Sequence, residues 1–320
     1  MRLALAGDTM LGRGVADALS RDPTALVADA VASVMRACDL CIVNLECCIS
    51  TRGHRWPAPD KRFFFRAPPR AVELLAHLGV DCVTLANNHA LDFGKDALLD
   101  TLEHLRAAGI GWVGAGADLE AARAPRVFEA GGTRLGILAF SDHPAEFAAG
   151  PERPGIAYVD LRGAGAPRWV HRAIAAARRS ADAVLVSPHW GPNMTTEPVP
   201  HARAAAAELR KAGATLVAGH SAHVFHGTGG SVIFDLGDFL DDYAVDPVLR
   251  NDLGLLWVVD LDGSGPRRVE ALPLKLEYCH TRLADGDDAA WIARRLRTAC
   301  EALGATARWS DRRLVIESAR

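Results

Sequence analysis

Side chains that commonly bind metal ions follow five of the apolar runs that the sequence predicts to be strands. They lie in the segments Gly7-Asp8-Thr9, Asn44-Leu45-Glu46, Asn87-Asn88-His89, His189-Trp190-Gly191 and Gly219-His220-Ser221-Ala222-His223. In open α/β sheets, ligands bind at the carboxyl ends of the strands, where loops surround a crevice. Each segment alone is a weak signal, but together the five predict one shared site.

Carboxylates, amides and imidazoles in one place favour a divalent metal centre. Such ligands suit Mn, Fe, Zn or Co better than a closed structural zinc site. A carboxylate between two ions can bridge them, and such a pair activates water for a displacement at phosphorus. We therefore expect one or two divalent ions, with Mn, Zn or Fe as the favoured elements.

The elements that must position these side chains alternate between strands and helices, which predicts an α/β fold with parallel strand pairs. Strands are expected at residues 3–6, 40–45, 82–86, 126–129, 134–140, 183–188, 215–218, 232–235 and 255–260, and helices at 70–78, 95–108, 167–180 and 201–212. Gly131-Gly132 joins two of these strands directly, which predicts a β-hairpin and therefore mixed sheets.

The composition changes after about residue 277, where a helix pattern at 287–303 precedes a short strand pattern at 313–317. We therefore predict a main domain over residues 1–276 and a helical tail or small appended subdomain over residues 277–320. A lid over the site or a dimer surface is compatible with this tail, and the sequence leaves open whether the chain forms a homodimer.

Composition excludes several classes of function. The chain has 320 residues, of which 49% are hydrophobic and 23% charged, as is usual for a globular protein. Its 36 basic and 39 acidic side chains leave a formal charge of −3, which gives no support to a nucleic-acid binder with a basic face. We find no apolar stretch of the roughly 20 residues that a membrane span needs, nor a secretory signal, so we expect a cytoplasmic protein.

The seven cysteines point the same way, because an odd number without an export signal argues against a disulfide framework. Cys38 and Cys41, with Cys47 and Cys48 nearby, have a spacing that also allows a metal or redox role. However, Cys41 and Cys82 lie inside strand-like apolar runs, and free cysteine commonly behaves as a small buried hydrophobe. We expect the cysteines to belong to the core.

Read in order, these segments resemble the CapA family, also called capsule or poly-γ-glutamate biosynthesis proteins (PgsA), of the calcineurin-like metallophosphoesterase superfamily. The resemblance covers about residues 1–262. Besides the five segments above, it is carried by Phe65-Arg66-Ala67-Pro68, by Ala90-Leu91-Asp92-Phe93-Gly94 and by Leu236-Gly237-Asp238-Phe239. It implies a four-layer α/β/β/α sandwich made of two mixed sheets with helices outside.

The resemblance also implies metal ligands: Asp8 and His223 for one ion, Asn88, His189 and His220 for the other, and Glu46 as a bridge between them. Two positions depart from the expected pattern. Met10 stands where metallophosphoesterases typically supply a histidine, so one ion lacks a ligand. Asp238 stands where the family usually has an asparagine.

The remaining implied roles concern the substrate. His89 would act as general acid or oxyanion stabiliser, and Asp92 would orient it. Arg13 and Arg66 are expected to bind an anionic group, because guanidinium suits phosphate and carboxylate. His226 is a further candidate for substrate contact. In addition, three loop histidines are expected near the site, namely His54, His143 and His201.

Three functions fit this pattern. The first is a metal-dependent hydrolase that acts on a phosphate ester or a related anionic substrate, either a small molecule or a peptide. The second is a peptide epimerase, because some CapA-like proteins encoded beside peptide natural-product genes remove and return an α-proton. The third is a component of capsule or poly-γ-glutamate synthesis that retains the pocket without turnover.

Overall fold

The computed structural model describes residues 1–59, 61–163 and 165–318. The larger sheet contains, from edge to edge, β19 (Ala305–Ser310), β20 (Arg313–Ser318), β17 (Gly265–Glu277), β16 (Leu253–Asp262), β1 (Arg2–Thr9), β2 (Leu40–Leu45), β5 (Cys82–Thr84) and β6 (Gly111–Val113). In addition, β15 (Asp238–Leu240) pairs with β1, and β18 (His280–Leu283) with β17. β1 is parallel to β2 and antiparallel to β16, so the sheet is mixed as expected.

The smaller sheet supplies the other half of the sandwich. Its order is β13 (Thr228–Gly229), β14 (Val232–Ile233), β12 (Leu216–Ala218), β11 (Ala183–His189), β9 (Thr133–Ser141) and β8 (Arg126–Ala130). β11 is parallel to both β9 and β12, whereas β8 and β9 are antiparallel. The turn between β8 and β9 contains Gly131 and Gly132, both with positive φ, which confirms the predicted hairpin.

Two short strand pairs and the helices complete the chain. The pairs are β3 (Cys48–Ile49) with β4 (Arg66–Ala67), and β7 (Ala115–Gly116) with β10 (Gly155–Ile156). The helices are α1 (Arg13–Arg21), α2 (Asp29–Arg36), α3 (Ala71–His77), α4 (Gly94–Ala107), α5 (Leu119–Arg123), α6 (Arg168–Ser180), α7 (Pro200–Lys211) and α8 (Gly286–Glu301), with 3-10 turns at Pro23–Leu26 and Ala145–Phe147.

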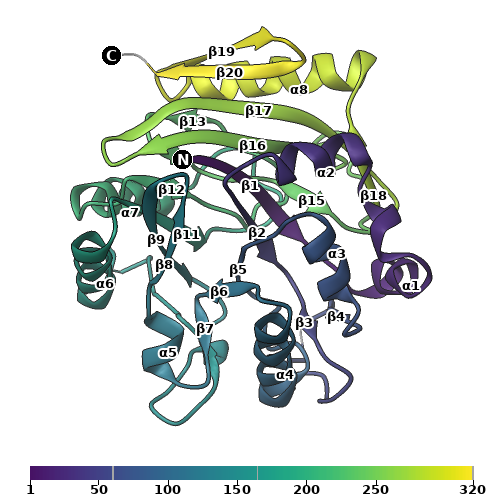
Figure 1. Ribbon diagram of the computed structural model, residues 1–320, viewed down its shortest axis with the longest axis vertical. Helices are drawn as coiled ribbons and strands as arrows, with labels where there is room; N and C mark the ends of the chain where they lie inside the picture. Colours follow the sequence, from purple (N-terminus) through teal and green to yellow (C-terminus); the bar gives the residue numbers. More distant parts are fainter. Residues whose placement is uncertain (60, 164, 319–320) are drawn as a thin grey trace.

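Alternation along the buried strands creates three apolar layers. On β1, Leu3 and Leu5 pack between the two sheets, whereas Ala4 and Ala6 face the core beneath α1 to α4. On the smaller sheet, Leu185 points into the core between the sheets, and its neighbours on β11 point to the core beneath α6 and α7. Helices thus cover both outer faces (Figure 1), which confirms the four-layer α/β/β/α sandwich.

The chain beyond β17 continues the larger sheet. β20 pairs with β17, and β19 pairs with β20 at the sheet edge (Figure 1). Ile292 and Leu296 of α8 join the same core that lies between the two sheets. α8 therefore packs against the face of the larger sheet that the smaller sheet covers elsewhere. The boundary between residues 276 and 277 stays a prediction.

Several boundaries differ from the sequence-based expectation. The strand expected at 82–86 ends at Thr84, because the N–H of Asn87 folds back to donate to the carbonyl of Leu85 (2.9 Å). The strand expected at 232–235 ends at Ile233. The sequence reading also missed α1 and α2, two helices of about two turns each, which are shorter than the windows over which helical periodicity is usually recognised.

All seven cysteines are unpaired, and every one except Cys38 is buried, which confirms their core role. Burial raises the pKa of the Cys48 thiol to about 12, so the metal-binding thiolate is disfavoured there. Within the described ranges, no helix is both long enough and apolar enough to cross a membrane.

We expect Gly7→Ala to lower the free energy of unfolding by about 1–3 kcal/mol. A Cβ at Gly7 would lie 1.8 Å from the carbonyl oxygen of Gly237, just where β15 approaches β1. Urea unfolding followed by circular dichroism measures the change. Gly163→Ala is the control, because its Cβ would meet only Asp160 Oδ2, at 4.0 Å. Equal stability of the two variants would contradict the close approach.

Candidate metal centre

The predicted ligands converge from both sheets. Asp8 lies near the end of β1, and Glu46 follows β2. His189 ends β11, and His220 follows β12 and forms an isolated parallel bridge with His189. The carboxyl ends of four strands thus meet at one edge of the sandwich, as the sequence predicted.

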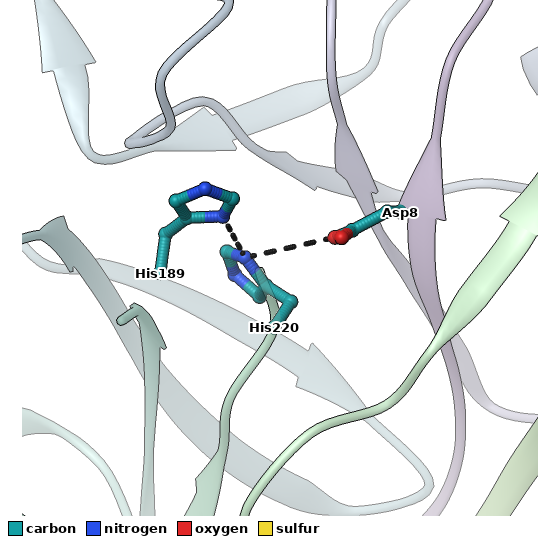
Figure 2. Close-up of side chains that lie close together, drawn as sticks. All are labelled: Asp8, His189 and His220. Carbon is teal, nitrogen blue, oxygen red and sulfur yellow. Dashed lines mark hydrogen bonds and ion pairs between the residues drawn. The ribbon is translucent and has the colours of Figure 1, made fainter. Parts of the chain in front are cut away.

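One cluster consists of Asp8, His189 and His220, whose candidate ligand atoms all lie within 4.8 Å of one another. Figure 2 shows the two imidazoles facing each other, with the Asp8 carboxylate directed at His220. The two Nδ1 atoms are 2.8 Å apart, and His220 Nδ1 lies 3.9 Å from Asp8 Oδ1. His220 Nε2 lies 3.2 Å from Ser187 Oγ, a contact that orients the ring so that Nδ1 faces the site.

A second cluster contains Asp8, His223 and Asp238. His223 Nδ1 lies 2.8 Å from Asp238 Oδ1 and 3.3 Å from Asp8 Oδ2. Asp238 was not among the predicted ligands, although it stood out as a carboxylate in place of the family's asparagine. Its signal in the sequence was its position two residues after Leu236, at the start of a strand that pairs with β1 at Asp8.

Asp8 is the residue that the two clusters share. Glu46 borders the first cluster, where its Oε1 lies 3.6 Å from His189 Nδ1. Its Oε1 also accepts a hydrogen bond from Asn44 Nδ2 (3.4 Å), and the same amide donates to Asp8 Oδ1 (2.7 Å). Asn44 therefore holds the two carboxylates side by side. The bridging role of Glu46 stays a prediction.

Burial of these carboxylates leaves several of their oxygens without a partner among the described side chains. Within the described ranges, the buried oxygens that lack a hydrogen-bond partner include Asp8 Oδ2, Glu46 Oε2, Asn88 Oδ1, Asp238 Oδ2 and Asp241 Oδ2. Burial raises the pKa of Asp8, and it raises the pKa of Glu46 and Asp238 well above their usual range. A divalent cation would satisfy both the oxygens and the charge, so the donor set fits a metal centre.

The histidines are suited to bind metal ions because they are neutral. Burial lowers the pKa of His220 to about 3, and burial together with neighbouring histidines lowers the pKa of His189 well below its usual value. Neutral imidazole offers the lone pair that a cation needs. His189 Nε2 is also buried without a hydrogen-bond partner among the described residues.

The loop that carries His223 has an unusual backbone. Ser221 has φ of 123° and His223 has φ of 60°, both in the region that side chains other than glycine rarely adopt. Such conformations persist at functional sites when the surroundings enforce them. Here the N–H of Ala222 donates to the buried Asp235 carboxylate (2.8 Å), which fixes the loop between the two histidines.

His89 and Asp92 lie together as expected. His89 Nδ1 is 2.7 Å from Asp92 Oδ2, and the same oxygen accepts the N–H of Phe65 (2.7 Å). Lys61 Nζ lies 3.0 Å from the other Asp92 oxygen. Asp92 is therefore held from three sides and orients the imidazole. Burial lowers the pKa of His89 to about 4 despite this carboxylate, so the ring is neutral at physiological pH.

A cavity of about 340 Å³ opens beside these groups. It is lined by Arg13, Phe63, Phe65, His89, Asn193, Met194, His223, Tyr243, Ala244 and Asn251. The Arg13 guanidinium lies over the rings of Phe65 and Tyr243, at 5.7 and 5.8 Å from their centroids. It also pairs with Asp242 (2.9 Å). The cavity wall thus contains a residue of the second cluster, His223, together with the Arg13 guanidinium and aromatic rings.

Some predicted residues lie elsewhere. Arg66 is not part of the cavity wall, because its guanidinium stacks on Phe93 at 4.2 Å and donates to the carbonyl of Arg52. His226 is also outside the wall, with Nε2 2.8 Å from the carbonyl oxygen of Thr195. Met10 is buried in the core beneath the helices, where its sulfur accepts the N–H of Gly12 (3.0 Å), so it offers nothing to the metal clusters.

Sequence reasoning missed a third polar group beside the first cluster. Asp142 contacts His143 Nδ1 (2.5 Å) and His201 Nε2 (3.1 Å), and the His143 ring lies 5.0 Å from that of His189. The two histidines were candidates, but Asp142 was not, because it is 59 residues from His201 and only the fold joins them. His54 is absent from both clusters and from the cavity wall.

Fold and site together define a four-layer α/β/β/α protein with a candidate two-ion centre at its strand ends. The chain belongs to the family described as bacterial capsule synthesis protein PGA_cap, whose model matches residues 2–243. This match confirms the CapA resemblance that the sequence segments carry.

Named relatives agree with this family. A probable polyglutamine synthesis accessory protein of Mycobacterium tuberculosis is 33% identical over 273 residues, which is 80% of this chain and 71% of that protein. The PGA biosynthesis protein CapA of Bacillus subtilis is 29% identical over 74% of this chain and 62% of that protein. A hypothetical protein from Thermus thermophilus has a similar fold, with a TM-score of 0.51 at 18% identity, covering 86% of this chain and 99% of that one.

Because Asp8 belongs to both clusters, we expect Asp8→Ala to abolish binding of both ions. His220→Ala and Asp238→Ala should each remove one ion of the pair and leave the other. Elemental mass spectrometry after reconstitution with Mn or Zn measures the content per chain. His171→Ala, on the exposed face of α6, is the control. Full metal content in Asp8→Ala would show that the ions bind elsewhere.

Metal affinity should fall as the pH drops from about 7.5 to about 5.5. Burial raises the pKa of the cluster residue Asp238 well above its usual range and that of its neighbour Asp241 to about 6, so protons compete with the cation for Asp238 and neutralise the carboxylate beside it. His220 stays neutral throughout. Each proton released on binding weakens affinity about tenfold per pH unit below the pKa. Titration with Mn²⁺ at several pH values measures the slope, and a flat profile contradicts competition by carboxylates.

Proposed function

We propose that this protein is a metal-dependent hydrolase of the metallophosphoesterase type, acting on a phosphate ester or a related anionic substrate. The observation that carries the proposal is the pair of buried carboxylate–histidine clusters that share Asp8, one of which contributes His223 to the wall of the cavity that Arg13 and His89 also line. Two divalent ions held there would activate water and stabilise charge at phosphorus. The ions expected are Mn, Zn or Fe.

His89 has the contacts of an acid–base group. Asp92 accepts from its Nδ1, which leaves Nε2 as the nitrogen available to the substrate. In the free protein the ring is neutral, because burial lowers its pKa to about 4. An anionic substrate in the cavity favours the imidazolium form, from which Nε2 donates a proton to the leaving oxygen.

The cavity wall indicates what the substrate carries. Arg13 borders the cavity and is held there by Asp242 (2.9 Å), so the rest of its guanidinium is positioned to contact an anionic group. Phe63, Phe65 and Tyr243 form apolar walls beside it, which favour a substrate with an apolar or ring portion next to the anion. The seven unpaired cysteines support a reducing compartment, so we propose that the enzyme works in the cytoplasm.

His89→Ala should lower the turnover of bis(4-nitrophenyl) phosphate by about 10²–10⁴-fold, because a positioned acid–base group contributes that much. Its metal content should stay unchanged, since His89 belongs to neither cluster. Release of 4-nitrophenolate by the Mn- or Zn-loaded protein measures the rate, with His171→Ala as the control. Unaltered turnover in His89→Ala would remove this residue from the mechanism.

The names of the relatives favour a second candidate, an accessory role in polyglutamate synthesis. A fully metal-loaded protein that hydrolyses no phosphoester but copurifies with synthesis proteins would favour that role. Uptake of deuterium at a peptide α-carbon, without any phosphate release, would instead favour the epimerase hypothesis.

A further inference from the structure

A second cavity, of about 400 Å³, lies where α8 packs against the body of the protein. Its wall comes from α8, from the start of α7 and from the segments around Glu197 and Gly227. None of its lining residues belongs to the wall of the cavity beside the metal clusters. We call it the α8 cavity and define it by Arg203, Arg294, Arg295, Thr196 and Thr298.

Arg295 is the unusual side chain of this cavity. Its Nη2 is buried and has no hydrogen-bond partner among the described residues. The guanidinium lies over the rings of Phe225 and Trp291, at 5.2 and 5.4 Å from their centroids, and no carboxylate in the described ranges pairs with it. Burial lowers its pKa, with no acidic neighbour to oppose the shift. A half-buried cation without a counterion carries a desolvation cost, and an anion would relieve that cost.

Two more arginines border the same space. Arg203 is held in place by the carbonyl of Pro198, to which its Nε donates (3.0 Å). Arg294 is exposed and makes no ion pair or hydrogen bond within the described residues. Glu197 is the one acidic side chain in the described wall. Its side chain is 80% exposed, and its Oε2 lies 4.0 Å from Arg203 Nη2, so this ion pair is long. Three guanidinium groups thus share a single exposed carboxylate.

The cavity is built by close packing. A Cβ on Gly227 would lie 2.4 Å from the backbone of Ala299, so only glycine lets this loop approach α8 so closely. The same chain segment contributes to both cavities, because Asn193 and Met194 line the cavity beside the metal clusters and Thr196 and Glu197 line this one. The α8 cavity is therefore a fixed feature of the fold.

We propose that the α8 cavity binds a small, multiply charged oxyanion through the guanidinium groups of Arg203, Arg294 and Arg295. Guanidinium binds phosphate and carboxylate oxygens in paired hydrogen bonds, and Thr196 and Thr298 add hydroxyl donors. The cavity has room for a phosphate group or a small dicarboxylate. This site lies apart from the metal centre and does not depend on the function proposed above.

Isothermal titration calorimetry with inorganic phosphate and, separately, with succinate tests the proposal. The titrations use the full chain carrying Asp8→Ala, which removes the metal ions and therefore any anion binding to them, and the Arg295→Gln comparison separates the α8 cavity from Arg13. We expect one site for at least one of the two anions, and the choice between them identifies the ligand chemistry. Adding Arg295→Gln should weaken binding at least about tenfold, as expected for loss of a charge-assisted contact. Arg308→Gln, an exposed arginine on β19 outside the cavity, should leave it unchanged.

Two results would overturn the proposal: no binding of either anion, or equal affinity in the protein with and without Arg295→Gln. Circular dichroism establishes that each variant is folded. If Arg295→Gln does not fold, Arg294→Gln replaces it, because that side chain is exposed and its loss leaves the core intact. Arg294→Gln should also weaken binding, and unchanged affinity would again reject the site. Hydrolase activity is not measured, so this result is independent of the proposed reaction.

Discussion

Negative charge buried around Asp8 is the constraint on which the rest of the site depends. Asp8, Glu46, Asp235 and Asp238 are each no more than 1% exposed, and each has its pKa raised by burial. At an effective dielectric constant of about 20, two like charges about 4 Å apart repel by about 4 kcal/mol. His189 and His220 are held uncharged and cannot offset this repulsion, so among the cluster histidines only His223, which lies against Asp8 and Asp238, opposes it. A divalent cation between these carboxylates would let them ionise together, which is why the buried charge points to a metal centre.

The sandwich explains why so much charge can be brought together. Short strands of both sheets end at the same edge, and β15 is drawn against β1 by two glycines, Gly7 and Gly237, that leave room for the backbone. That approach places Asp238 beside Asp8. The strained Ser221–His223 loop is held by Asp235, which is itself buried. Apolar layers on both sides of each sheet supply the stability that offsets strain and desolvation at this edge.

The sequence was most informative where periodicity and chemistry coincide. Asp8, His189 and His220 stand at or beside the carboxyl ends of buried strands, so a shared site at those ends could be predicted from the sequence. Asp142 could not, because it is 59 residues from His201 and only the fold brings the two together. Arg66 has a guanidinium that could bind an anion, but the packing of the fold places this group on the ring of Phe93, which the sequence does not reveal. β17 was missed because Pro266 and Pro273 interrupt a strand whose partners on both sides are distant in sequence.

Met10 and Asp238, the two departures from the family pattern, both change the types of ligand that the clusters offer. Met10 stands where a histidine was expected, so a neutral nitrogen ligand is missing there. Its sulfur accepts a hydrogen bond from the N–H of Gly12 in the core. Asp238 adds an anionic oxygen ligand to the cluster that contains His223. One cluster therefore offers two imidazoles and a carboxylate, whereas the other offers one imidazole and two carboxylates. Oxygen-rich sites suit Mn²⁺, and imidazole-rich sites suit Zn²⁺ or Fe²⁺. The two departures from the family pattern thus give this chain two chemically different positions joined by the single carboxylate of Asp8.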